Sequence, residues 1–108
     1  MARTHHWQSG GVGIYSFDDA TSSWQIIGDA IYGNNEGQKS GSSLELSGDG
    51  QRIVFGSEYE DIVRIYENIS DEWVQVGSDI YQVDENYDGN TNTSVSISND
   101  GKVVAVGS

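Results

Sequence analysis

The sequence predicts an all-β fold built from two copies of one unit. Landmarks of the first half recur 49 or 51 positions further on, so the two halves share one pattern. Apolar residues stand in short runs rich in Val, Ile and Tyr, which favour strands, and no segment keeps a helical period for more than a turn. The recurring landmarks are the Ile-Tyr pairs at 14–15 and 65–66 and at 31–32 and 80–81, Trp24 with Trp73, Gly28 with Gly77, Gly50 with Gly101, and the Gly-Ser pairs at 56–57 and 107–108.

The first two strands of each copy form a predicted hairpin. Residues 13–17 and 61–66 carry β-branched and aromatic side chains, which are enriched in strands. A polar turn follows in both copies. The second strand then begins at Trp24 in the first copy and at Trp73 in the second, and a glycine ends it.

The third and fourth strands of each copy form a second predicted hairpin. Residues 43–47 and 94–98 alternate polar and apolar side chains, which indicates a strand. An Asp-Gly pair then supplies the positive φ angles of a tight turn. The fourth strands, 52–57 and 102–108, are continuous apolar runs, as expected of strands covered on both faces. A repeat of this length made of short strands predicts a propeller-like array, in which one unit cannot bury its own faces.

Together these motifs resemble the blades of β-propellers related to the FG-GAP and integrin α-chain repeats. The resemblance spans residues 11–108 and is carried by Ile-Tyr, Trp-x-Gln, Gly-x-x-Ile-Tyr and the run Ser-Val-Ser-Ile-Ser-Asn-Asp-Gly-Lys-Val-Val-Ala-Val-Gly-Ser. It implies four-stranded antiparallel blades around a central channel. Residues 94–98 are then innermost and residues 103–108 second, with the strand of Tyr66 third and the strand of Trp73 outermost.

The predicted organisation is an N-terminal tail at 1–10, a first repeat at 11–57 and a second repeat at 58–108, the repeats together forming one propeller unit. The predicted chain starts and stops in the middle of a blade, so its order of strands is permuted by half a blade. One complete blade, at about 42–77, stands between a leading pair of strands and a trailing pair. We expect these half blades to lie on opposite sides of the complete blade, each with an unpaired strand edge.

The incomplete sheets predict assembly of the chain with itself. Joining the trailing half of one chain to the leading half of the next is a head-to-tail contact, which closes into a ring when the rotation per chain divides a full turn. Propellers hold about 4–8 blades, so two blades per chain allow a dimer, a trimer or a tetramer. We expect a homotrimer with six blades, and a homotetramer with eight is the second choice.

The charge of the chain is strongly acidic, with 17 acidic residues against 5 basic ones and a net charge of −12. Such a surface repels nucleic acid and anionic membranes, so no nucleic-acid partner is expected. Apolar stretches such as 103–106 are far too short to span a bilayer, so no membrane insertion is expected. The absence of Cys removes disulfides and thiolate metal sites and leaves the redox compartment open.

One loop carries a calcium-site motif. Asp84, Asn86 and Asp88 stand at alternate positions before Gly89, as oxygen ligands do at the start of a calcium loop. The twelfth position is Val95 where an EF-hand has a bidentate Glu, so the alternative is a polar surface loop rich in turn-forming residues. The turns between inner strands, where the resembling repeats carry calcium, are shortened here, and no calcium is expected in them.

Trp24 and Trp73 recur at equivalent strand positions, which favours packing between blades over a ligand platform. Glu45 is an acid in an inner strand, and the other copy has Ser96 in its place. A ring of such carboxylates around a channel would bind a cation; the alternative, which we favour, is a set of solvated acids at a channel mouth.

No catalytic group of residues is visible, because the inner-strand serines have no histidine placed to form a triad. The sequence therefore predicts a protein that is not an enzyme. The favoured function is a structural or assembly fragment of a propeller, excised or engineered from a longer one. The alternative is a recognition or adhesion module that binds carbohydrate, protein or calcium, for which the resemblance implies an extracellular location.

Overall fold

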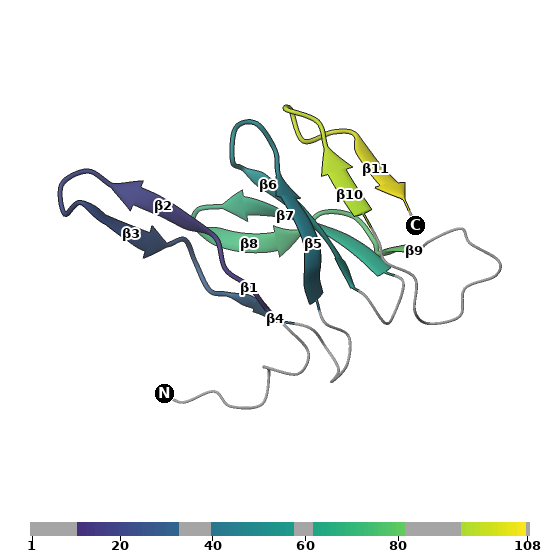
Figure 1. Cartoon of the computed structure of the whole chain (residues 1–108), viewed down its shortest axis with the longest axis horizontal. Helices are drawn as coiled ribbons and strands as arrows, with labels where there is room; N and C mark the ends of the chain where they lie inside the picture. The colour runs from purple at the N-terminus through teal and green to yellow at the C-terminus, as the bar shows by residue number, and fades with distance from the viewer. Residues whose placement is uncertain (1–10, 33–39, 58–61, 82–93, 108) are drawn as a thin grey trace.

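The computed structural model describes residues 11–32, 40–57, 62–81 and 94–107, and every regular element in these segments is a β-strand (Figure 1). The predicted all-β class is confirmed for this part of the chain, and the predicted tail at 1–10 lies outside it. The strands are β1 (Gly11–Val12), β2 (Tyr15–Asp18), β3 (Ser23–Ile26), β4 (Ile31–Tyr32), β5 (Ser40–Leu46), β6 (Arg52–Ser57), β7 (Ile62–Ile69), β8 (Glu72–Gln75), β9 (Ile80–Tyr81), β10 (Ser94–Ile97) and β11 (Val104–Gly107).

The largest sheet is an antiparallel array in the order β5-β6-β7-β8, with the short strand β9 also paired to β7. The four strands expected at about 42–77 are therefore present and in chain order. Strand β6 lies inside this sheet, and the side chains of Ile53, Val54 and Phe55 are all buried. A continuous apolar run suits this position because its side chains meet apolar groups on both faces.

Two separate hairpins flank the central sheet. Strands β2 and β3 form one, and β10 and β11 form the other. Figure 1 shows the first at one end of the view and the second at the other, with the central sheet between them. A third small pair, β1 with β4, continues the first hairpin towards the middle of the molecule.

The leading segment (residues 11–32) and the trailing hairpin pack on opposite faces of the central sheet, and neighbouring side chains of β6, which point in opposite directions, contact one each. Ile53 and Phe55 form one apolar cluster with residues of the leading segment. Val54 belongs to a second cluster, which includes Ile97 of β10. The expectation that the leading and trailing pairs lie on opposite sides is confirmed. The leading segment contributes Val12, Ile14 and Ile31 to the first cluster.

The sequence repeat is reproduced in the strand registers. Every ladder pair of β10–β11 lies 51 positions after a pair of β5–β6. The hairpin β2–β3 matches β7–β8 with an offset of 51 positions in its first strand and 49 in its second: Phe17 lies opposite Trp24, and Asn68 lies opposite Trp73. The short pair β1–β4 corresponds to the start of β7 with β9. One part of the chain is therefore a structural template for the other.

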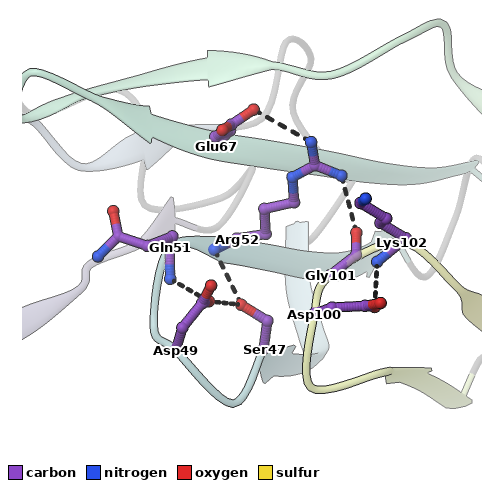
Figure 2. Close-up of polar contacts among 8 residues, drawn as sticks. All are labelled: Ser47, Asp49, Gln51, Arg52, Glu67, Asp100, Gly101 and Lys102. Carbon is purple, nitrogen blue, oxygen red and sulfur yellow. Dashed lines mark hydrogen bonds and ion pairs between the residues drawn. The ribbon is translucent and has the colours of Figure 1, made fainter.

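The turns after β5 and β10 also match, with one correction to the sequence-based expectation. Gly50 and Gly101 have positive φ angles of 72° and 74°, but the preceding aspartates do not have positive φ. The side chain of Asp49 instead accepts hydrogen bonds from the Gln51 amide (3.0 Å) and the Ser47 hydroxyl (2.7 Å), as Figure 2 shows. These bonds hold the pKa of Asp49 below its ordinary value. The aspartate therefore stabilises the turn as a hydrogen-bond acceptor.

Candidate functional site

The candidate calcium ligands Asp84, Asn86 and Asp88 lie outside the described residues. In the segments that the structure does describe, no group of three or more His, Cys, Asp or Glu side chains could hold a metal ion. Within those segments the candidate features are the contacts between the central sheet and its two hairpins, the surfaces that lack such contacts, and one cleft.

Trp73 joins the second repeat to the first. Its ring packs against the cluster formed by Ile53 and Phe55, and its Nε1 donates a 2.9 Å hydrogen bond to the carbonyl oxygen of Ile27. Ile27 is held in turn by a 2.8 Å backbone bond from its amide to the Ile14 carbonyl. A buried or half-buried indole usually needs such an acceptor, and here the acceptor belongs to the neighbouring hairpin.

Trp24 has the equivalent position in the first repeat but a different environment. Its side chain is 67% exposed, and its ring meets the edge of Phe17 in the same hairpin at 5.3 Å between centroids. Phe17 is itself exposed. Both tryptophans were expected to pack between blades, and the structure places one of them between the sheet and a hairpin and the other on the outside.

Other pairs of repeat-equivalent residues also differ in how far their side chains are buried. Ile97 is 8% exposed because it packs on Val54 and its neighbours, whereas Leu46, 51 positions earlier, is 43% exposed. Phe55 is 2% exposed, whereas Val106 is 36% exposed. In each pair the buried residue has a hairpin or a strand beside it, and the exposed residue lacks the corresponding neighbour among the described residues.

Two of the open strand edges in the described part of the chain have counterparts that are paired in the central sheet. Strand β2 pairs there with β3 alone, and β11 pairs with β10 alone. Their counterparts in the central sheet, β7 and β6, pair with each other over six positions. Exposed edges of this kind are templates for pairing with another strand.

A polar clasp holds the trailing hairpin to the central sheet. The Arg52 guanidinium donates a 2.8 Å hydrogen bond to the Gly101 carbonyl and forms a 3.3 Å ion pair with Glu67 (Figure 2). The turns themselves touch, since the Gly48 amide donates to the Asn99 carbonyl at 3.1 Å. These contacts fix the angle between the two sheets at the end where the turns lie.

Glu45 also belongs to this contact. Its Oε1 accepts hydrogen bonds from the Ile97 amide (2.8 Å) and from the Ser96 hydroxyl (3.1 Å). Sequence reasoning treated this carboxylate as a solvated acid or a cation ligand at a channel. In the structure Glu45 is exposed, and it also joins β5 to β10, because its side chain reaches a backbone N–H of the neighbouring strand.

A second polar network, around Arg64, was not predicted. The buried Arg64 guanidinium contacts both carboxylate oxygens of Asp79, at 2.9 and 3.2 Å, and Gln75 donates to the same carboxylate at 2.7 Å. The hydrogen bonds from Arg64, and then from Gln75, lower the pKa of Asp79. A signal for this network was present in the sequence, because the two copies of the repeat differ at all three of its positions. Their equivalents in the first copy are Gly13, Ile26 and Ala30.

One cleft is lined by both acidic and aromatic residues. It has a volume of about 600 Å³ and lies between the 28–32 segment and the turn that joins β7 to β8. Stacking surfaces beside hydrogen-bonding carboxylates suit a polyol such as a sugar. Its lining includes the acids Asp29, Asp71 and Glu72 and the aromatic residues Tyr32, Tyr66 and Trp73.

Comparisons of the chain with family models, with curated proteins and with solved structures find no match. The resemblance to FG-GAP and integrin-type blades therefore stays a prediction. The part of the chain that the structure describes contains no helix long and apolar enough to cross a membrane.

Proposed function

We propose that the chain is a non-catalytic assembly fragment whose copies join head to tail and close into a β-propeller. The trailing hairpin of one chain and the leading hairpin of the next would form one four-stranded blade. A homotrimer with six blades is the favoured ring, because six lies in the middle of the usual range of about 4–8 and relaxes the splay of the strands. A homotetramer with eight blades is the second choice.

The observation that carries the proposal is the unequal burial of equivalent residues. In the second repeat, Trp73 and Ile97 are covered by contacts between the central sheet and a hairpin. In the first repeat, Trp24 and Leu46 present the same types of surface to solvent. A second copy of the chain would carry the missing cover, because its trailing hairpin matches the one that already packs on this sheet.

The energetics favour such a joint. Fully burying an exposed large apolar side chain contributes about 1.5–3 kcal/mol, and covering one that is already partly buried contributes less. Association costs about 4–15 kcal/mol in lost freedom, so several covered residues are needed. The exposed candidates with better-covered equivalents are Tyr15, Trp24, Leu44, Leu46, Ile80 and Val106. Pairing the edges of β2 and β11 adds backbone hydrogen bonds to this apolar gain.

A pair of charge substitutions tests the proposal. Leu46→Asp places a carboxylate on a surface that the trailing hairpin of the preceding chain would cover, so this variant should sediment as single chains and keep its β-sheet circular dichroism. Ile69→Asp is the matched control: Ile69 is also exposed, but its equivalent is already Asp18, and this variant should keep the assembled mass. Equal masses for wild type, Leu46→Asp and Ile69→Asp would contradict the proposal.

The second candidate function is a recognition or adhesion module, and the cleft between Asp29 and Trp73 favours it. Such a module would bind carbohydrate, protein or calcium, in an extracellular setting. A ligand that binds the folded chain must raise its melting temperature. Melting curves with calcium, and with a panel of oligosaccharides, would reveal this function, and unchanged melting temperatures in all of them would argue against it.

A further inference from the structure

We infer that β11 of one chain pairs antiparallel with β2 of the next chain in the register that β6 and β7 already show. Val104 then lies opposite Tyr15, and Ala105 lies opposite Ile14. The inference rests on the head-to-tail assembly proposed above, and it adds the two partner strands and their alignment.

The template for this pairing is inside the chain. Strand β6 is joined to β7 with Ile53 opposite Tyr66 and Val54 opposite Ile65. Strand β11 corresponds to β6, and β2 corresponds to β7, with a constant separation of 51 positions. Because the other hairpins of the two repeats share their registers, the unpaired strands have the same geometry as the paired ones.

The side-chain faces agree with this register. Val104 already packs towards the central sheet of its own chain, beside Val54 and Val63. Ile14 already packs towards the central sheet of its own chain on the other face, in the cluster of Phe55. In the inferred pairing Val104 and Ile14 point to opposite faces of the new sheet, so both existing contacts are kept. A slip of one residue would turn one of these side chains to the wrong face.

The same alignment gives Trp24 a partner. The ring of Trp24 would meet the central sheet of the chain that supplies β10 and β11. Its Nε1 would donate to the carbonyl of the partner's Val76, as Trp73 donates to Ile27 within the chain. Val76 and Ile27 are equivalent, and each amide bonds the carbonyl of an equivalent residue, at Ile65 and at Ile14.

The edge of the joint offers a position for a chemical probe. In the template, Arg52 lies opposite Glu67, and the two form an ion pair. Their equivalents in the joint are Val103, which is 66% exposed, and Ser16, which is also exposed. Directly opposite residues of an antiparallel pair are close enough for a disulfide. The wild-type chain has no Cys, so introduced thiols are the only ones present.

The test is oxidation of Ser16→Cys/Val103→Cys under mild conditions, followed by a non-reducing gel and mass spectrometry. Asp18→Cys/Val103→Cys is the matched control, because Asp18 lies on the same face two positions away, where the diagonal distance of about 7–8 Å is too long. The inference predicts several-fold more product of linked chains from the first variant. In a closed ring, the largest product equals the mass of the whole assembly.

The outcomes separate this inference from the proposed function. Linked chains mainly from the control, or from neither variant while light scattering still gives a multiple of the chain mass, would overturn the register and leave the assembly standing. Single chains in solution would overturn both. A disulfide within one chain would also contradict both, because β2 and β11 lie on opposite sides of the central sheet.

Discussion

The indole nitrogen of Trp73 lies 2.9 Å from the carbonyl oxygen of Ile27, and this hydrogen bond ties the second repeat to the first. Trp24 has the equivalent place 49 positions earlier, but the described structure leaves it largely exposed. The two residues therefore form a natural comparison. Trp73 makes a contact between neighbouring sheets, and Trp24 makes no such contact within the described residues.

Substituting each tryptophan with phenylalanine should have different effects. Trp73→Phe keeps most of the ring but loses the bond to Ile27, so it should destabilise the folded chain by about 0.5–1.5 kcal/mol, as measured by urea unfolding. Trp24→Phe should leave the stability of a separated chain unchanged and weaken assembly by roughly 2–10-fold. A Trp24→Phe variant that loses stability as a single chain and dissociates like wild type would contradict this assignment.

Alanine at the two turn glycines should differ in its cost. Gly50 and Gly101 both have positive φ, so alanine is strained at either position by about 1–2 kcal/mol. An added Cβ at Gly50 meets open space, whereas at Gly101 it would lie 2.8 Å from Cδ of Arg52. Gly101→Ala should therefore be the more destabilising of the two in urea unfolding, because Arg52 must move and give up its clasp. Equal losses would contradict the role of that clasp.

The Asp79 carboxylate should make stability depend on pH. Hydrogen bonds from Arg64 and Gln75 lower its pKa in the folded chain below the ordinary value of 3.8. Its contribution is complete above that ordinary value and is lost as pH falls through the lower folded pKa. Asp79→Asn should destabilise the chain by about 1–3 kcal/mol near neutral pH, since hydrogen bonds to a charged group are lost.

The difference in unfolding free energy between wild type and Asp79→Asn should then shrink as pH falls below 3.8. Asp49 and Asp100 also have lowered pKa values, and both proteins retain them, so the difference isolates Asp79. A difference that stays constant from neutral pH to the acid limit would contradict the ion pair with Arg64.

Glu45 should act through its hydrogen bonds and not through its charge. Glu45→Gln keeps an acceptor for the Ile97 amide and should change stability little. Glu45→Ala removes the acceptor and should cost about 0.5–1.5 kcal/mol in urea unfolding. Calcium should not raise the melting temperature through this residue. A calcium-dependent rise that Glu45→Gln abolishes would instead support the cation-binding interpretation.

Much of the fold was predictable because the repeat supplied each signal twice. The runs of β-branched residues and the tryptophans located the long strands, and the alternating runs located the hairpins β5–β6 and β10–β11. The shortest strands were missed: the Ile-Tyr pairs at 31–32 and 80–81 were recognised as landmarks but not as β4 and β9. Strands of two residues carry no periodicity, so only their tertiary partners reveal them.

The contacts between elements were less predictable. Arg64 and Asp79 are 15 positions apart and meet only because β7 leads through β8 into a returning segment. Glu45 and Ile97 lie on different sheets, and no local pattern links them. Both contacts depend on how sheets are placed in space, and a pattern of residue types along one chain does not encode that placement directly.

The most direct test of the account is the solution mass of the wild-type chain by light scattering over a range of concentrations. The account predicts an assembly of three 11.7 kDa chains, or of four as the second choice, that dissociates only on strong dilution. A compact protein with the mass of one chain at every concentration, in which the amides of β2 and β11 are already protected from hydrogen exchange, would contradict it.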